Sequence, residues 1–376
     1  MIEQNKHIYI ICGSGGVGKT TTAAALGLSL AGGGKKVLVL TIDPARRLAT
    51  ALGLTSLSDD PQLIKTDFSG ASCGELWAMR LNTKRTFDRL VDKYASSRET
   101  RDRIFHNKLY QHLSKMLAGT QEYMAMEKLY EIDKQAVYDV IVVDTPPMQN
   151  AVDFLAAPLK MMNVINNSLL HLLIKPAMSL GKTGFKLLGK GSRPILKIFD
   201  RITGFAFMQD LSEMLIAFQD LLTGFESRAV EVDALLQRES SAFILVGTTG
   251  QSSVDEMKKF FAQLTERGYH LKSVIVNRVY EGEVLSQYKM KQVKAVLSDL
   301  GGAPAARILV DNYRRFIPLI KNDAAQIAVL REGVAPRRVI SIPLFYTDVH
   351  DLEGLSKISQ FFHFDSTADN SQNEKV

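Results

Sequence analysis

Residues 12–22, CGSGGVGKTTT, form a glycine-rich stretch between an apolar run and a segment rich in alanine and leucine. The apolar run at 7–11 predicts a strand and residues 23–30 predict a helix, so the glycines lie in a strand-to-helix turn. Positions 13–20 match the pattern G-x-x-x-x-G-K-[ST], whose backbone N–H groups cradle phosphate oxygens. The sequence therefore predicts a phosphate-binding loop around which the rest of the chain is arranged.

Each part of this loop has an expected role. Lys19 should reach the β- and γ-phosphates of a nucleotide, and the hydroxyl of Thr20 should ligate Mg²⁺. The helix that starts near Lys19 adds its positive dipole end to the same site. The predicted nucleotide-binding residues of the loop are Gly13, Ser14, Gly15, Gly16, Val17, Gly18, Lys19, Thr20 and Thr21.

The composition is that of an ordinary globular chain. Its 376 residues are 46% apolar and 23% charged, which suits one large or two ordinary domains. The net charge of +6 comes without an RNA-binding or zinc-finger pattern, so nucleic acid is not a predicted partner. Cys12 and Cys73 give neither a disulfide framework nor a C-x-x-C pair, which favours a reducing, cytoplasmic compartment. No secretion signal and no membrane-spanning helix are expected.

Two further strands end on aspartate. The apolar run 36–42 is followed by Asp43, and the run 138–143 by Asp144. In parallel sheets ligands bind at the carboxyl ends of strands, so both carboxylates should lie beside the glycine loop. Asp144 is predicted to hold the water shell of Mg²⁺. Asp43 is a second candidate for the metal and for catalysis, and a plain helix N-cap remains its alternative.

The remaining pattern is α/β. Strands are expected at 76–81, 242–248, 271–277 and 339–343, and helices within 83–133 (with a break near 96–97) and at 253–267, 283–300 and 351–362. This alternation predicts a P-loop NTPase fold: a doubly wound, mostly parallel sheet with helices on both faces and a helical insertion subdomain. The predicted ATPase domain covers 1–157 and 238–365, and 366–376 is predicted to be a disordered tail.

Residues 158–237, the insertion, have a different composition. Between 159 and 209 eight Lys or Arg residues stand against one acid, Asp200, among many Met, Leu and Phe side chains. One interpretation is an adaptable apolar groove whose basic rim suits anionic lipid. The other is a helical subdomain whose apolar stripe packs on a core, with solvated lysines outside.

Taken together, the loop and the motifs at 43–45 (DPA) and 144–147 (DTPP), with Phe154, Leu155 and Pro158, resemble one family. They are similar to the ArsA-type ATPases: the arsenite-pump ATPase, the cytosolic targeting factor for tail-anchored proteins and the MinD relatives. The resemblance is to the bacterial anion-transporting ATPase branch and spans about residues 6–157 and 240–362.

The resemblance implies ATP hydrolysis to ADP and phosphate with Mg²⁺, in a dimeric cytoplasmic switch coupled to a client protein or a membrane process. It implies that Asp43 positions or activates the attacking water and that Asp144 lies in the second switch. Asn277, followed by Arg278, matches the family's adenine-reading asparagine, and the loop at Pro343 resembles the second wall of that pocket.

One departure concerns the cation of the site. The family's loop carries a signature lysine that crosses a dimer interface, and here that place is Ser14. Serine cannot neutralise charge on a transferring phosphoryl group, a loss worth several orders of magnitude in rate. Three explanations stay open: a paralogous partner donates the lysine, a homodimer uses Arg46 or Arg47, or the chain is a slow nucleotide-binding subunit.

Other departures concern the cargo. The arsenite-binding cysteines and the dimer-bridging zinc C-x-x-C are missing, so arsenite efflux is not expected. The insertion at 158–237 occupies the place where targeting factors keep their client groove. An ATP-gated module that binds apolar helices, peripheral at the membrane, is therefore an alternative function. A weakly active subunit of a heterodimer is another.

Overall fold

The computed structural model describes residues 7–43, 45–66, 74–95, 97–107, 110, 121–146, 227–334 and 338–362. Within these limits the chain forms two compact units: one lies in residues 1–80, 138–151 and 237–376, the other in 81–137 and 152–236. Most of the predicted insertion (158–226) and the predicted tail (366–376) fall outside the described residues. The domain boundaries stay predictions.

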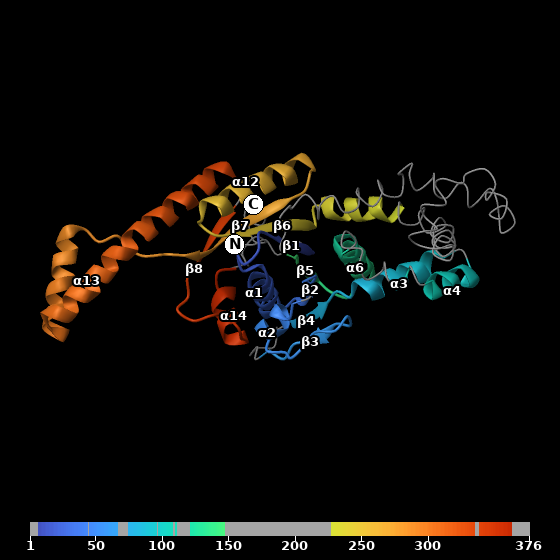
Figure 1. The fold of residues 1–376 in the computed structure, drawn as a ribbon, viewed down its shortest axis with the longest axis horizontal. Coiled ribbons are helices and arrows are strands. Elements are labelled where there is room, and N and C mark those ends of the chain that lie inside the picture. The colour runs from blue at the N-terminus through green and yellow to red at the C-terminus, as the bar shows by residue number, and fades with distance from the viewer. Residues whose placement is uncertain are drawn as a thin grey trace, which may run out of the picture. The chain divides into compact units, whose positions relative to one another are not determined.

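The first unit is built on one eight-stranded sheet with the order β3-β4-β2-β5-β1-β6-β7-β8 (Figure 1). Every neighbouring pair is parallel except β3 with β4, which confirms the predicted fold class. The strands are β1 (Ile8–Cys12), β2 (Lys36–Thr41), β3 (Gln62–Leu63), β4 (Glu75–Arg80), β5 (Val140–Asp144), β6 (Ser241–Gly247), β7 (Leu271–Val279) and β8 (Arg338–Pro343). Only the short β3 was not predicted.

The three central strands explain how the site is positioned. All residues of β1 and β5 are buried, as expected for parallel strands that are covered on both faces. In the register, Asp144 is level with Ile11 of β1 and with Thr41 of β2. The carboxyl ends of these strands therefore meet at one edge, where the glycine loop and both predicted aspartates follow them.

Helices cover both faces of the sheet. Helix α1 (Lys19–Gly32) packs with α14 (Leu352–Ser359) against one face, in a core that includes Tyr9 and Ile11. Helix α12 (Gln251–Glu266) covers the other face, where Met257 packs closely against Gly247 at the end of β6. Figure 1 shows α1 and α12 on opposite sides of the strands. The short α2 (Arg47–Ala51) follows β2.

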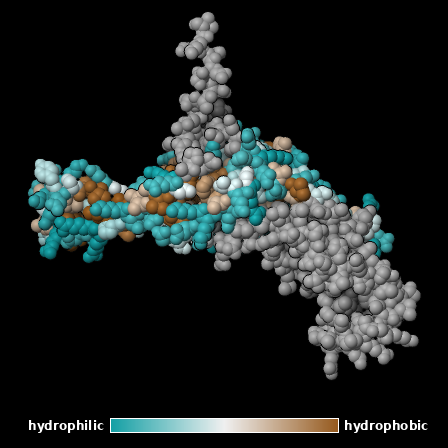
Figure 2. All heavy atoms as spheres, turned by 90° about the horizontal axis from the view of Figure 1, so that it is seen from above, coloured by the Kyte–Doolittle hydropathy of each residue, from teal (hydrophilic) through white to brown (hydrophobic). Residues whose placement is uncertain are grey.

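Helix α13 (Gln287–Gly333) is longer than the sequence pattern predicts. The expected helix 283–300 begins at 287, where Ser286 caps it by accepting from the backbone N–H of Lys289, and it ends at a kink with Gly302 at φ 81°. A second helical stretch then runs to 333, which was not predicted because Gly301, Gly302 and Pro304 are typical helix-ending residues. Large apolar side chains of α13 are exposed, as the brown spheres at the left of Figure 2 show; they include Leu300, Ile308, Leu309, Phe316 and Leu319.

The second unit contains α3 (Thr83–Tyr94), α4 (Arg98–His106), α6 (Gln121–Gln135) and a helix at 227–237. The side chains of Asn82 and Ser97 cap α3 and α4, so the predicted break between two helices near 96–97 is confirmed. Among the described residues of both units, no helix is long and apolar enough to span a membrane.

Candidate functional site

A cavity of about 540 Å³ opens in the first unit at the carboxyl edge of the sheet. It brings together the glycine loop, the start of α1, the turn after β2, the end of β7 and the loop before α14. Its lining residues are Gly16, Gly18, Lys19, Thr20, Thr21, Asp43, Arg46, Arg47, Thr50, Ala51, Thr145, Arg278, Val349 and His350.

The loop has the backbone that a phosphate cradle needs. Gly18, at the N-cap of α1, has φ 97°, a left-handed conformation that favours glycine. A Cβ at Gly18 would also collide with the side-chain amide of Asn277, and one at Gly13 with the carbonyl oxygen of Val246. No side chain caps the N-terminus of α1, so its first N–H groups are available to an anion.

Lys19 lies at the base of this cradle. It is 6% exposed, and its Nζ donates to the carbonyl oxygen of Ser14 at 2.6 Å. Burial lowers the pKa of Lys19, while the nearby charges of Asp144 and Asp43 raise it. The ammonium therefore stands in a partly desolvated place, where its attraction to a phosphate is stronger than in water.

Asp144 is completely buried at the end of β5. Its Oδ2 accepts from the hydroxyl of Thr41 at 2.8 Å, while its Oδ1 is buried without a hydrogen-bond partner among the described residues. Burial raises the pKa of Asp144 to about 6, against the effects of the Thr41 and Thr20 hydroxyls and of the Lys19 ammonium. A buried carboxylate oxygen without a partner fits the water shell of a cation, as predicted for Mg²⁺.

The described residues hold no group of three or more His, Cys, Asp or Glu side chains that could bind a metal by themselves. This does not conflict with Mg²⁺, which keeps several waters and is usually held by one or two protein groups together with substrate phosphates. Thr20 and Asp144 supply groups of this kind beside the cradle.

Asp43 lines the cavity but does not cap a helix. Helix α2 begins after Arg46, and no side chain caps it, so the alternative of a plain N-cap is wrong. Oδ1 of Asp43 instead accepts from the backbone N–H of Ala45 at 2.9 Å, and Oδ2 lies 3.7 Å from Nη1 of Arg47. These contacts hold the carboxylate at the cavity wall, where a water molecule could be oriented.

Asn277 braces the loop. Its Nδ2 donates to the carbonyl oxygen of Val17 at 2.8 Å, and its Oδ1 accepts from the backbone N–H of Arg278 at 2.9 Å. Arg278 lines the cavity and has φ 60°, an uncommon conformation for a residue with a side chain. The ladder between β7 and β8 shifts register at this point. Local strain of this kind is frequent at functional sites.

The structure does not place every predicted residue in the cavity wall. Pro343 ends β8, and the following loop reaches the cavity at Val349 and His350 instead. Val17 is buried, whereas Gly15 is exposed. Five residues of the cavity wall were not predicted from the sequence: Thr50, Ala51, Thr145, Val349 and His350. Among them, only Thr145 lies in a motif, DTPP, that could have identified it.

A phosphate cradle between β1 and α1, with carboxylates after β2 and at the end of β5, defines a P-loop nucleoside triphosphatase. The chain belongs to the anion-transporting ATPase (ArsA) family, whose pattern matches residues 6–298. The family resemblance seen in the motifs is thereby confirmed, and with it the class of ATP-binding ATPases.

Two named relatives align along nearly the whole chain at low identity, and a third aligns over less than half of it. The ATPase GET3 of Malassezia globosa is 24% identical over 366 residues, which is 96% of this chain and 92% of that protein. A putative arsenical pump-driving ATPase 1 of Aquifex aeolicus is 23% identical over 370 residues, 96% of this chain and 80% of that protein. An ATPase ASNA1 homolog of Babesia bovis is 31% identical over 160 residues, 43% of this chain and 40% of that protein.

Proposed function

We propose that this chain binds ATP with Mg²⁺ in the cavity and hydrolyses it as a dimeric nucleotide switch. The observation that supports this most is that Lys19 and Asp43 share one cavity wall, with the buried Asp144 close enough for its charge to act on Lys19. In a purely structural site, a buried ammonium and a buried carboxylate oxygen would both be fully hydrogen-bonded or ion-paired within the protein.

Each group has a proposed task. The loop N–H groups and Lys19 hold the phosphates, and the hydroxyl of Thr20 with Asp144 (through water) holds Mg²⁺. Mg²⁺ held by these two residues would supply positive charge beside the phosphates. Asp43 orients the attacking water, since its carboxylate is held at the wall by Ala45 and Arg47. Asn277 is proposed to brace the loop through Val17, and contact of its amide with the adenine edge, which the family resemblance implies together with Arg278 and the loop at Pro343, is the alternative.

The missing signature lysine makes a partner necessary in this proposal. A paralogous chain that carries the lysine would donate it across a dimer interface into this site. The exposed apolar side chains of α13 support the presence of a second chain, because such surfaces are usually covered in an assembly. The alternative is a homodimer with its own cation, and it is favoured by Arg46 and Arg47 in the cavity wall.

The switch is proposed to act on a membrane-related or client-protein process. The insertion at 158–237 would bind an apolar helix or anionic lipid in one nucleotide state, with the chain cytoplasmic and peripheral at the membrane. Hydrogen exchange of this segment in the apo, ADP and ATP states tests the idea. Equal exchange in all three states would exclude a nucleotide-gated groove.

The ATP site is tested by calorimetric titration of ATP into the purified chain and its Lys19→Ala variant. Removal of the buried ammonium should weaken ATP binding by about two orders of magnitude. Lys259→Ala, a change at an exposed lysine of α12, is the control and should bind as the wild type does. Equal affinity of Lys19→Ala and wild type would refute the proposed site.

Assays of each chain alone and of the mixture separate the remaining alternatives. A rise in turnover on addition of the lysine-bearing paralogue supports the heterodimer. Full turnover of the chain alone, lost in Arg46→Ala or Arg47→Ala, supports the homodimer. Turnover near background in both cases supports the weakly active subunit.

A further inference from the structure

A second cavity, of about 470 Å³, lies in the helical unit and is lined by α3, α6 and the helix at 227–237. All of its lining residues belong to this one unit, so it is separate from the cavity at the sheet edge. Its volume is within the range of pockets that bind small organic molecules. Tyr130 and Leu90 provide apolar surface in its wall.

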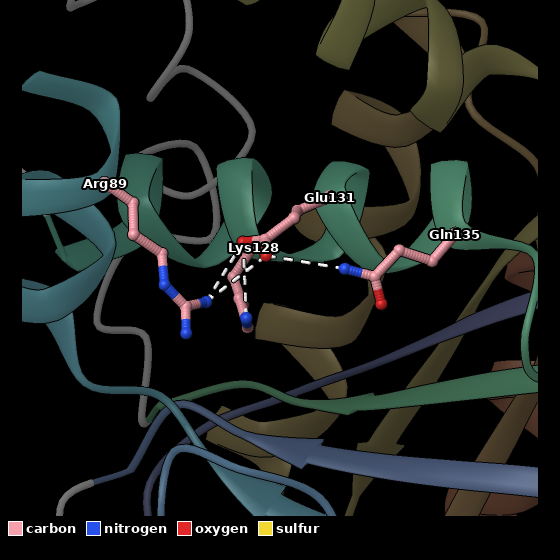
Figure 3. A network of polar contacts seen from close by, with 4 residues as sticks. All are labelled: Arg89, Lys128, Glu131 and Gln135. Carbon is pink, nitrogen blue, oxygen red and sulfur yellow. Dashed lines mark hydrogen bonds and ion pairs between the residues drawn. The ribbon is translucent and has the colours of Figure 1, made fainter. Parts of the chain in front are cut away.

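The cavity has an excess of positive charge. Four cationic side chains line it, and only two carboxylates, those of Glu127 and Glu131, do so. Glu131 is already occupied: it accepts from Arg89 at 3.2 Å, from Lys128 at 3.2 Å and from Gln135 at 3.5 Å (Figure 3). A third carboxylate, that of Glu231, is not part of the wall and pairs with Arg228 at 2.9 Å. Three carboxylates therefore face the four cations, and that of Glu131 is also shared with Lys128.

The excess positive charge of the cavity lies on its two lysines. Lys93 of α3 and Lys134 of α6 form no ion pair within the part of the chain that the structure describes. Their close contacts are with aromatic rings, at 5.4 Å from Lys93 Nζ to the ring of Tyr94 and at 5.3 Å from Lys134 Nζ to that of Tyr130. An ammonium over an aromatic face remains able to donate hydrogen bonds on its other side.

Two buried donors at the cavity wall also have no hydrogen-bond acceptor among the described residues. One is the hydroxyl of Thr86, which is 3% exposed, and the other is Nε of Arg228, which is 7% exposed. Nε of Arg228 lies 3.4 Å from the carboxylate of Glu127 without forming a hydrogen bond. Buried polar groups are nearly always hydrogen-bonded, so the Thr86 hydroxyl, which has no such bond, and the Arg228 Nε, which has only a long ion-pair contact, indicate a ligand that accepts from them.

The rest of Arg228 is held firmly. Its Nη1 donates to Glu231 at 2.9 Å, its Nη2 donates to the hydroxyl of Tyr94 at 2.8 Å, and its guanidinium stacks on Tyr130 at 4.1 Å from the ring centre. Arg228 is therefore preorganised, and a ligand that meets Nε does not have to order this side chain on binding.

We propose that this cavity binds a small organic dianion, with Lys93 and Lys134 supplying charge and with Thr86 and Arg228 supplying fixed donors. The anionic group is a phosphate monoester or a pair of carboxylates, since both present several acceptor oxygens and two negative charges. The apolar part of the ligand packs on Tyr130 and Leu90. This inference does not depend on the proposed ATPase function.

The test is calorimetric titration of the full-length chain at low ionic strength with saturating Mg·ADP, which excludes binding at the phosphate loop. The probes are glucose 6-phosphate, succinate and inorganic phosphate, with glucose as the uncharged control. Saturable binding of glucose 6-phosphate or succinate, but not of glucose, is expected, and the stronger of the two identifies the anionic group. Absence of saturable binding of every charged probe up to about 10 mM would overturn the proposal.

Variants connect the binding to the cavity. Lys93→Gln/Lys134→Gln should weaken binding by about tenfold or more, and Thr86→Val, which keeps the side-chain shape, by about threefold to tenfold. The matched control Lys259→Gln/Lys291→Gln removes two exposed lysines of the other unit and should change affinity less than about twofold. Equal losses in the double variant and its control would show a general charge effect and refute the site. The circular dichroism spectra and the basal rates of ATP hydrolysis of these variants should equal those of the wild type. If the double variant does not fold, the affinity of Thr86→Val alone tests whether the ligand binds in this cavity.

Discussion

The hydroxyl of Ser14 donates a hydrogen bond to the carboxylate of Glu256, which joins the phosphate loop to helix α12. By the family resemblance Ser14 stands where the signature lysine is expected, and its side chain points to a carboxylate. A lysine introduced at position 14 would meet this carboxylate before it could reach a second nucleotide site.

We therefore predict that the effect of Ser14→Lys depends on Glu256. In Ser14→Lys/Glu256→Gln the lysine is free to cross, and the steady-state ATPase rate of the chain alone should rise by about tenfold or more. In Ser14→Lys the rise should be smaller by a factor of about three, because Glu256 is exposed and pairs weakly with the ammonium. The control is Ser14→Ala/Glu256→Gln; if its rate equalled that of the lysine double variant, the crossing cation would not be what limits turnover.

The Asp144→Asn substitution should raise the stability of the fold and lower the rate of ATP hydrolysis. Burial disfavours the Asp144 carboxylate, whose pKa is raised to about 6, and asparagine keeps an acceptor for Thr41. We expect urea unfolding at pH 7.5 without nucleotide or metal to show a gain of about 1–3 kcal/mol. Magnesium-dependent hydrolysis should fall by about two orders of magnitude.

Asp139→Asn provides the comparison for this change. Asp139 directly precedes the same strand, is exposed and accepts from the backbone N–H of Lys36 at 2.7 Å. Its substitution should alter stability by less than about 0.5 kcal/mol. A loss of stability in Asp144→Asn would mean that the carboxylate contributes more to the fold than its desolvation costs.

The sequence predicted those parts of the site that local patterns encode. The glycine loop, Asp43 and Asp144 each follow an apolar strand, and the parallel register then brings them together. By contrast, the contact of Asn277 with Val17 joins residues 260 positions apart and depends on how β7 packs beside the loop. The cavity of the helical unit likewise depends on the packing of three separate helices, so no sequence motif predicts it.

Asn277→Ala tests whether this side chain reads adenine or braces the loop. Both polar atoms of its amide are engaged, with the carbonyl of Val17 and the N–H of Arg278. We expect the variant to weaken ATP and GTP binding equally, by about threefold to tenfold, because the loop loses a hydrogen bond. The measurement is the affinity for both nucleotides, with Asn312→Ala on exposed α13 as the control. A loss confined to ATP would instead show recognition of adenine.

Glu127 should make the stability of the helical unit depend on pH. It is buried, and burial raises its pKa from 4.5 to about 7, against the hydrogen bond from Tyr123 (2.7 Å), the charge of Arg228 (3.4 Å) and that of Lys93, while Glu231 adds to the rise. The folded state thus binds more protons than the unfolded state between these two values. The stabilisation is complete below pH 4.5 and is lost as pH rises to about 7.

The shift corresponds to a loss of about 3 kcal/mol at most over this window. Glu127→Gln keeps an acceptor for Tyr123 and cannot ionise, so its free energy of unfolding should fall less than that of the wild type between pH 5 and pH 7. Chemical denaturation at several pH values provides the comparison. Glu231→Gln, which changes the exposed partner of the same Arg228, should retain the wild-type fall in stability. Parallel pH profiles for Glu127→Gln and wild type would show that Glu127 is ionised in the folded protein throughout, with Arg228 fully compensating its burial.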